Sequence, residues 1–249
     1  MLFSDKVLFL HVPKAAGSSV KSFLIHNLSG PITLIRPSHP LSSAEAPIGV
    51  RLEVALKRMR HEISFLLRPR LKRIAGQPHA NLVQACEALA RFGRKLDDFE
   101  VVLAIIRNPY DLEVSRFHYL RRGHLGVPGL AHTDTERLAL AGDFAAFAER
   151  APYHGRARLE EWFEIDGRMP PNLGVLRFET LEADLRRAPT PFCRKFPPLP
   201  HLNASVHEPY ARYLSPGIEE AIYRKYRWAF DRGFYQRELK LPHPSTGSG

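Results

Sequence analysis

The stretch from residue 7 to residue 28 constrains the fold of this chain more than any other part of the sequence. Residues 7–12, VLFLHV, form an apolar run typical of a buried parallel strand. The loop PKAAGSS follows, and apolar residues then recur at helical spacing at Val20, Phe23, Leu24 and Leu28. A strand, a loop of small residues and a helix start form an anion site, because backbone N–H groups point out of the helix N-terminus.

Strands and helices alternate along the rest of the chain. We predict strands over residues 100–106 and 174–178. Further helices are predicted over 82–92, from the RNPYD segment to Arg122, over ETLEADLRR, and from Ser215 and Pro216 onward. The last helix is expected to bury a stripe formed by Ile218, Ile222, Tyr226 and Phe230. This alternation favours one α/β sheet of parallel strands flanked by helices.

The intervening segments carry weaker signals. Residues 30–50, rich in Pro, Ser and Gly, are predicted to be a long connection, and residues 123–170 to hold loops and short helices. The segment 51–74 is strongly basic with a helical pattern that Pro69 should break. It forms either a rim for an acidic glycan or a solvated helix face. We expect one domain over residues 1–240 and a flexible tail over 241–249.

Charge and composition limit the partners and the compartment. The 249 residues carry a formal net charge of +10, which favours anionic ligands without choosing among them. No apolar run approaches the roughly 20 residues of a bilayer span, and the N-terminal stretch lacks a signal-peptide cleavage site. The two cysteines, Cys86 and Cys193, provide no disulfide framework. A cytoplasmic protein with no membrane span is therefore expected.

Two motifs carry the chemistry. In the first, Lys14 precedes Gly17, Ser18 and Ser19, the reverse of the Walker A order, in which the lysine follows the glycines. The second, RNPYDLEVS, places Ser115 eight residues after Arg107, which ends a predicted strand. An arginine fork suits a phosphate because it donates two parallel hydrogen bonds. The simplest alternatives are a solvated lysine, an ion pair of Arg107 with Asp111, and a serine packed against the sheet.

Both motifs resemble those of the sulfotransferases that use 3′-phosphoadenosine 5′-phosphosulfate (PAPS). The 5′-phosphosulfate loop of that family reads P-K-[ST]-G-[TS]-[TS] or P-K-T-G-[GS]-T-S, and its R-N-P-x-[DE] motif has a serine eight residues after the arginine. The segments VLRFETLEADL, LPHLNAS and YRWAFDRGFY are also similar to compact carbohydrate-type members, so the resemblance spans about residues 7–235. Ala15 and Ala16 depart from the family loop, which removes one hydroxyl donor.

The resemblance implies a P-loop-like three-layer fold and transfer of a sulfuryl group from PAPS to a hydroxyl of a carbohydrate or glycan, with adenosine 3′,5′-bisphosphate as product. It assigns Lys14 to the charge that develops on the 5′-phosphate, and Arg107 with Ser115 to the 3′-phosphate. The donor site would comprise Lys14, Ala15, Ala16, Gly17, Ser18, Ser19, Arg107, Ser115 and, from the proline-rich loop, Asn203. His201 lies in the same loop and could also reach the nucleotide.

The acceptor hydroxyl requires a general base, which family members supply as His or Glu between the two phosphate motifs. His79 is the candidate preferred here, although a histidine that caps the following helix, or one that simply lies on the surface, explains its position about equally well. Glu53 and Glu62 are alternatives. His11 is more readily explained as a satisfied residue inside the sheet.

Other classes of function fit less well. The histidines show no clustering at metal-ligand spacing, and PAPS chemistry requires no metal. A P-loop kinase would need an ordered Walker A motif and carboxylates for Mg²⁺. Only the net positive charge favours a nucleic-acid-binding protein, and no recognised nucleic-acid-binding motif supports it. A sulfotransferase-like protein that binds the nucleotide without turnover remains an alternative that only an assay separates.

Overall fold

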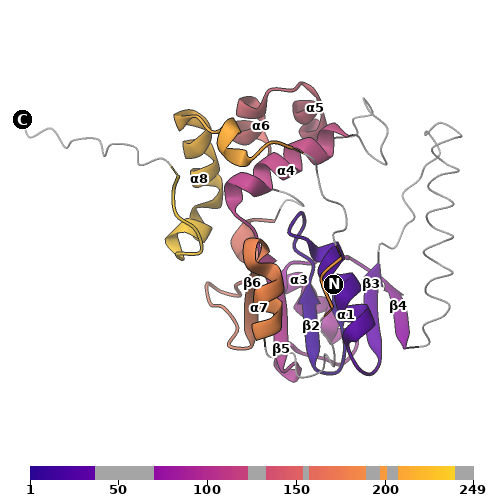
Figure 1. Ribbon diagram of the computed structural model, residues 1–249. Helices are drawn as coiled ribbons and strands as arrows, with labels where there is room; N and C mark the ends of the chain where they lie inside the picture. Colours follow the sequence, from indigo (N-terminus) through magenta and orange to yellow (C-terminus); the bar gives the residue numbers. More distant parts are fainter. Residues whose placement is uncertain (37–69, 123–132, 154–156, 189–196, 201–206, 239–249) are drawn as a thin grey trace, which may run out of the picture.

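A computed structural model describes residues 1–36, 70–122, 133–153, 157–188, 197–200 and 207–238 (Figure 1). It is an α/β structure with a six-stranded mixed sheet in the order β4-β3-β1-β2-β5-β6. The strands are β1 (Leu2–Phe3), β2 (Val7–Leu10), β3 (Ile32–Arg36), β4 (Leu71–Ala75), β5 (Val101–Ile106) and β6 (Leu173–Arg177). The predicted strands at 7–12, 100–106 and 174–178 correspond to β2, β5 and β6.

The described helices are α1 (Gly17–Asn27), α3 (Leu82–Ala90), α4 (Pro109–Arg121), α5 (Asp134–Leu140), α6 (Phe144–Arg150), α7 (Leu181–Arg187) and α8 (Pro216–Asp231). Figure 1 shows α1 and α7 in front of the sheet and α3 behind it, while α4, α5, α6 and α8 gather beyond one end of the strands. The helices predicted after the loop at 13–19, over 82–92, after RNPYD, over ETLEADLRR and from Ser215 are confirmed, as are short helices within the described part of 123–170, whereas the helical pattern at 51–69 lies outside the described residues. Among the described residues, no helix is both long enough and apolar enough to span a bilayer.

The prediction of a purely parallel sheet is wrong at β1. β1 pairs antiparallel with both β2 and β3, whereas the pairs β2–β5, β5–β6 and β3–β4 are parallel. The turn between β1 and β2 is tight, because Ser4 N donates to Val7 O at 2.8 Å and Val7 N donates to Ser4 Oγ at 3.1 Å. So short a connection can join only antiparallel strands.

Two further strands lie where other structure was predicted. β3 falls inside the stretch 30–50 that was expected to be a connection, and β4 lies beyond Pro69 at the end of the basic segment, where no strand was predicted. Lys72 and Arg73 lie in β4 at the edge of the sheet, a position where charged residues discourage edge-to-edge pairing. Pro69 and the rest of 37–69 lie outside the described residues.

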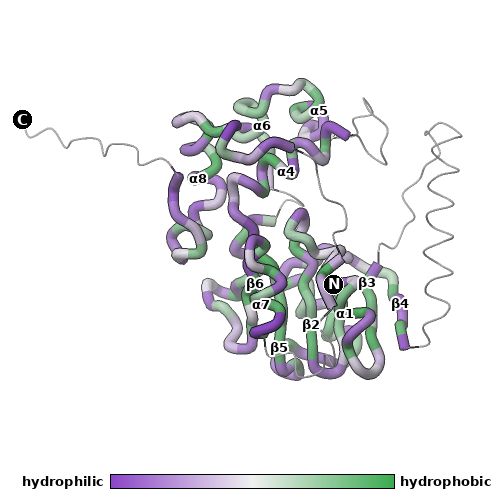
Figure 2. Tube along the Cα trace, in the orientation of Figure 1, coloured by the Kyte–Doolittle hydropathy of each residue, from purple (hydrophilic) through white to green (hydrophobic). Residues whose placement is uncertain are grey.

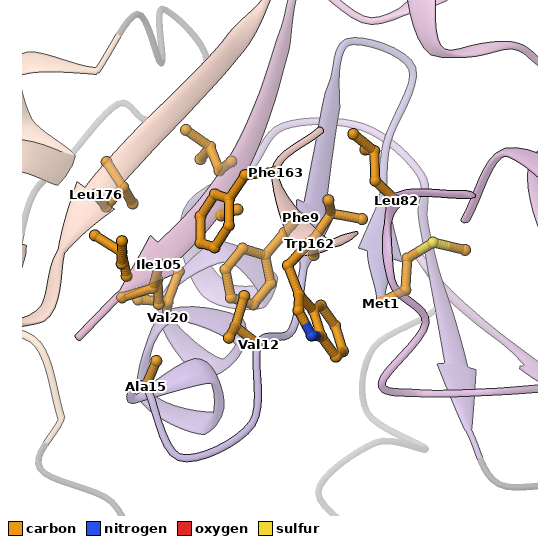
Figure 3. Close-up of a cluster of buried hydrophobic side chains, with 14 of the residues drawn as sticks. Met1, Phe9, Val12, Ala15, Val20, Leu82, Ile105, Trp162, Phe163 and Leu176 are labelled. Carbon is orange, nitrogen blue, oxygen red and sulfur yellow. The ribbon is translucent and has the colours of Figure 1, made fainter. Parts of the chain in front are cut away.

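The core forms around the central strands. Every residue of β2 and β5 is buried, as expected for parallel strands covered on both faces, and Figure 2 shows both strands as hydrophobic. In Figure 3 the side chains of Phe9, Val20 and Ile105 belong to one buried cluster. This packing fixes the ends of β2 and β5, which carry the two predicted phosphate motifs.

Capping residues fix the starts of α8 and α4, the two longest of the described helices. The Asn108 side chain accepts from Tyr110 N at 3.0 Å at the start of α4, and Pro109 occupies its first turn. Ser215 caps α8 in the predicted manner, its Oγ accepting from Ile218 N at 3.4 Å. In the predicted stripe of α8, Ile222 and Tyr226 are buried and Ile218 and Phe230 are partly buried.

Candidate functional site

The two predicted phosphate motifs meet at one edge of the sheet. β2 and β5 are parallel neighbours, so the residues that follow them emerge at the same edge. Arg107 Nη1 donates to the backbone carbonyl of Lys14 at 2.7 Å and to Ser115 Oγ at 3.1 Å. The structure therefore brings Lys14 together with Arg107 and Ser115, which lie 93 or more residues later in the sequence and were predicted to share one site with it.

Arg107 is held on several sides. Its Nε and Nη2 both donate to Asp111 Oδ2 at 2.8 Å, so the alternative ion pair with Asp111 is present. The guanidinium carbon lies 4.1 Å from the centroid of the Phe178 ring, and only 8% of Arg107 is exposed. Asp111 is thus one of several partners, and together they orient the guanidinium at the end of β5.

The segment that resembles the family at VLRFETL supports this arrangement. Phe178 stacks on Arg107, and the next residue, Glu179, accepts at 2.8 Å from Asn108 N through Oε1. Glu179 Oε2 accepts from the Tyr235 hydroxyl at 2.8 Å. The end of β6 is therefore tied to the start of α4 and to the C-terminal part of the described chain.

The loop after β2 has an unusual backbone. Lys14 and Ala16 adopt left-handed conformations, with φ of 62° and 55°, which cost free energy for residues other than glycine. Ala16 is the N-cap of α1, and its carbonyl accepts from Ser19 N at 2.9 Å. Alanine has no side-chain oxygen to cap the helix, and the first turn of a helix presents N–H groups without intrahelical acceptors. The start of α1 therefore has no side-chain cap from Ala16.

Ala15 explains one departure from the family loop. Its side chain is 1% exposed and belongs to the buried cluster drawn in Figure 3. A hydroxyl at this position would face the core. Ser18 is partly exposed at the loop surface, whereas Ser19 is buried. Ser18 is therefore the better placed of the two serines to offer its hydroxyl to a ligand.

Gly17 permits a close approach of His11 to the start of α1. A Cβ atom on Gly17 would lie 1.8 Å from Cδ2 of His11, closer than any non-bonded contact allows. His11 is 9% exposed and stacks on Phe9, with ring centroids 6.3 Å apart. It follows β2 rather than lying within it, and its ring packs against Gly17 at the start of α1.

The Lys14 ammonium lies in a partly desolvated, positively charged environment. Its Nζ is 4.1 Å from the centroid of the Tyr119 ring. Burial lowers the pKa of Lys14 to about 8, and the positive charges of Arg107 and Arg122 contribute to the decrease. A lysine that loses its solvation beside two arginines is poised to receive an anion.

His79 also contacts His11. Its Nδ1 lies 3.1 Å from the His11 carbonyl oxygen, and the two ring centroids are 4.4 Å apart. A carbonyl can only accept, so Nδ1 carries the proton and Nε2 of the neutral ring keeps its lone pair. Although the residue is exposed as a whole, desolvation of its ring lowers the pKa of His79 below the usual value. The neutral form therefore predominates near pH 7.

His79 does not cap the following helix. The N-cap of α3 is Asn81, whose side chain accepts from Gln84 N at 2.9 Å, while Gln84 Oε1 accepts from Asn81 N at 3.1 Å. The alternative of a helix-capping histidine is therefore wrong, whereas the alternative of a surface histidine agrees with the exposure of the residue. The other base candidates Glu53 and Glu62, and Asn203 and His201 in the proline-rich loop, lie outside the described residues.

Two aromatic residues of the site were not anticipated. Phe178 is the last residue of the strand predicted over 174–178, with no pattern to distinguish it. Tyr119 comes four residues after Ser115 on the same helix, a spacing that places both on one face and could have indicated it. Within the described ranges, no group of three or more His, Cys, Asp or Glu residues could hold a metal ion.

No family model, no curated protein and no solved structure matches the chain. The assignment of a function therefore rests on the residues of the site itself.

Proposed function

We propose that this protein is a PAPS-dependent sulfotransferase with a P-loop-like fold that acts on a hydroxyl group of a carbohydrate or glycan. The observation that carries the proposal is the contact of Arg107 with both the Lys14 carbonyl and Ser115 Oγ, at 2.7 and 3.1 Å. It joins the loop assigned to the 5′-phosphosulfate with the pair assigned to the 3′-phosphate. A nucleotide phosphorylated at both positions could engage both motifs together.

Each group has a role in an in-line transfer. The acceptor oxygen forms a bond to sulfur while the bond from sulfur to the 5′-phosphate oxygen breaks, and negative charge develops on that phosphate, as in phosphoryl transfer. The Lys14 ammonium and the N–H groups at the start of α1 stabilise this charge. Arg107 and Ser115 hold the 3′-phosphate and thereby orient the donor.

His79 is the proposed acceptor of the hydroxyl proton. Its hydrogen bond to the His11 carbonyl fixes the tautomer in which Nε2 can accept, and its lowered pKa keeps the ring neutral. His11 also packs on Gly17 at the start of α1. His79 and the start of α1 thus both contact His11, which fixes the position of the base relative to the loop at residues 13–19.

The test is a transfer assay with PAPS and a panel of neutral and acidic glycans, followed by chromatography of nucleotides and mass spectrometry of glycans. We expect adenosine 3′,5′-bisphosphate and a sulfated glycan in equal amounts, with Lys14→Ala lower by orders of magnitude. Phosphate transfer from ATP in place of sulfuryl transfer would contradict the proposal. Tight bisphosphate binding without transfer to any acceptor would favour a non-catalytic binding protein instead.

A further inference from the structure

The Lys14 ammonium is packed against the face of an aromatic ring. Nζ lies 4.1 Å from the centroid of Tyr119, within the range of a cation–π interaction. Tyr119 lies on α4, one turn beyond Ser115, and 51% of it is exposed. We propose that Tyr119 is a positioning residue that orients the Lys14 side chain toward the donor site. This inference rests on the proposed function for its catalytic consequence but not for the contact itself.

The backbone of Lys14 is already fixed without Tyr119. Its carbonyl accepts from Arg107 at 2.7 Å, and its φ of 62° defines the direction of the side chain. A lysine side chain nevertheless has four rotatable bonds and costs much conformational entropy to order. A ring in contact with the ammonium restricts the end of the chain that the backbone cannot control.

The choice of an aromatic partner has a chemical consequence. Arg107 is paired with the carboxylate of Asp111, which offsets its charge. A carboxylate beside Lys14 would likewise offset the charge that the donor phosphate needs. The face of a ring attracts a cation through its quadrupole and leaves the net charge of the ammonium intact. Tyr119 can therefore hold Lys14 while leaving its full charge for an anionic ligand.

The helix face links this contact to the other motif. Ser115 and Tyr119 are separated by four residues, so they lie on the same side of α4. Ser115 accepts from Arg107, and Tyr119 contacts Lys14. One face of α4 therefore contacts both Lys14 and Arg107, the cations assigned to the two phosphates of the donor.

The direct test is the mobility of the Lys14 side chain in the ligand-free protein. The Cε of ¹³C-labelled lysine is followed by NMR relaxation, with Lys14→Arg used to assign the signal. We expect a restricted signal in wild type and in Tyr119→Phe, which keeps the ring face, and a mobile signal in Tyr119→Leu. Tyr223→Leu is the matched control, because it removes a cation–π contact with Arg237, 4.0 Å from the ring centroid, at another site. Equal mobility of Lys14 in wild type and Tyr119→Leu would overturn the inference.

The second measurement is turnover with PAPS. Tyr119→Leu should lose about two- to fivefold, the equivalent of one exposed cation–π contact, and Tyr119→Phe should retain wild-type turnover. Loss of turnover in Tyr119→Phe as well would contradict a role for the ring face. If wild-type protein transfers no sulfuryl group, the proposed function fails, while the relaxation measurement still decides the contact between Tyr119 and Lys14.

Discussion

Arg107 Nη1 donates a hydrogen bond to the backbone carbonyl of Lys14 at 2.7 Å, across 93 residues of sequence. The contact joins the loop after β2 to the end of β5, and both strands are buried and hydrogen-bonded to each other. The conformation of the phosphate loop and the orientation of the guanidinium are therefore coupled. A substitution in either motif should therefore change the geometry of the other.

Arg107→Lys tests the planar fork at this junction. A lysine cannot donate simultaneously to Asp111, Ser115 and the Lys14 carbonyl. Losing a charge-assisted hydrogen bond to the 3′-phosphate should weaken adenosine 3′,5′-bisphosphate about 10- to 100-fold, with little change for AMP. Calorimetric titration measures the affinity for each of the two nucleotides. Arg227→Lys is the matched control, because Arg227 pairs with Asp231 at 3.0 Å on the exposed face of α8. An equal loss for AMP and the bisphosphate would contradict a 3′-phosphate site at Arg107.

Gly17→Ala tests the close approach of His11 to the start of α1. The added Cβ would lie 1.8 Å from His11 Cδ2, so the ring or the loop must move. Overpacking of this kind should lower the free energy of unfolding by about 1–3 kcal/mol in urea denaturation. Combining it with His11→Ala should recover part of the loss, because the two residues are in contact.

Gly217→Ala provides the control for that experiment. A Cβ at Gly217, in the first turn of α8, has nothing within 4 Å, so this substitution should be neutral or stabilise by about 0.5–1 kcal/mol. Equal effects of the two glycine substitutions would mean that the contact between Gly17 and His11 does not constrain the loop.

The strands that carry the site could be predicted from sequence, whereas the outer part of the sheet could not. β2 and β5 are continuous apolar runs, a pattern that burial on both faces requires. β1 has only two residues, too few for a periodic signal, and β3 follows Gly30 and Pro31. β4, with Lys72 and Arg73 at the sheet edge, has a composition that also suits a solvated helix.

The same contrast applies to the site. The resemblance to the sulfotransferase motifs implied a shared role for Arg107 and Ser115, and the two side chains are hydrogen-bonded to each other. The contacts of Tyr119 with Lys14 and of Phe178 with Arg107 could not be derived from spacing alone, because they depend on the relative placement of α4, β6 and the phosphate loop. Asn203 and the alternative base candidates lie outside the described residues, so their roles stay predictions.

The lowered pKa of Lys14 predicts a pH dependence of ligand binding. The ammonium form attracts the 5′-phosphate, and a bound anion raises the pKa of Lys14 above its ligand-free value of about 8. The affinity for adenosine 3′,5′-bisphosphate should therefore be highest below pH 8, and it should decrease as the pH rises above 8. Binding near pH 8.5 should take up protons, which calorimetry in two buffers of different ionisation enthalpy detects.

Lys14→Arg is the control for this dependence. An arginine stays protonated throughout, so its affinity should not change between pH 7 and pH 10, and its binding should take up no protons. Proton uptake that persists in Lys14→Arg would assign the titration to another group.

His79→Ala tests the proposed base. A positioned base contributes about 10²–10⁴-fold, so turnover should fall by that factor while affinity for the bisphosphate is kept. In wild type the rate should rise with pH through a pKa below the usual histidine value and then level off, because the neutral ring is the active form. Steady-state kinetics between pH 5 and pH 9 measure both effects.

His26→Ala is the matched control, because Nδ1 of His26 also contacts a backbone carbonyl, that of Ser22, at 2.6 Å on an exposed helix face. It should leave the rate and its pH profile unchanged. A profile that persists in His79→Ala would transfer the role to Glu53 or Glu62, whereas a parallel loss of bisphosphate affinity would show that His79 supports the loop instead.

Discrimination between adenosine 3′,5′-bisphosphate and AMP tests the central claim most directly. The two ligands differ only in the 3′-phosphate, which is assigned to Arg107 and Ser115. Arg107 Nη1 lies 3.1 Å from Ser115 Oγ. Titration of the wild-type protein with each ligand at pH 7 should give at least about tenfold tighter binding of the bisphosphate, the equivalent of one charge-assisted hydrogen bond. Equal affinity for the two ligands would contradict the assignment of this site to a 3′-phosphorylated nucleotide.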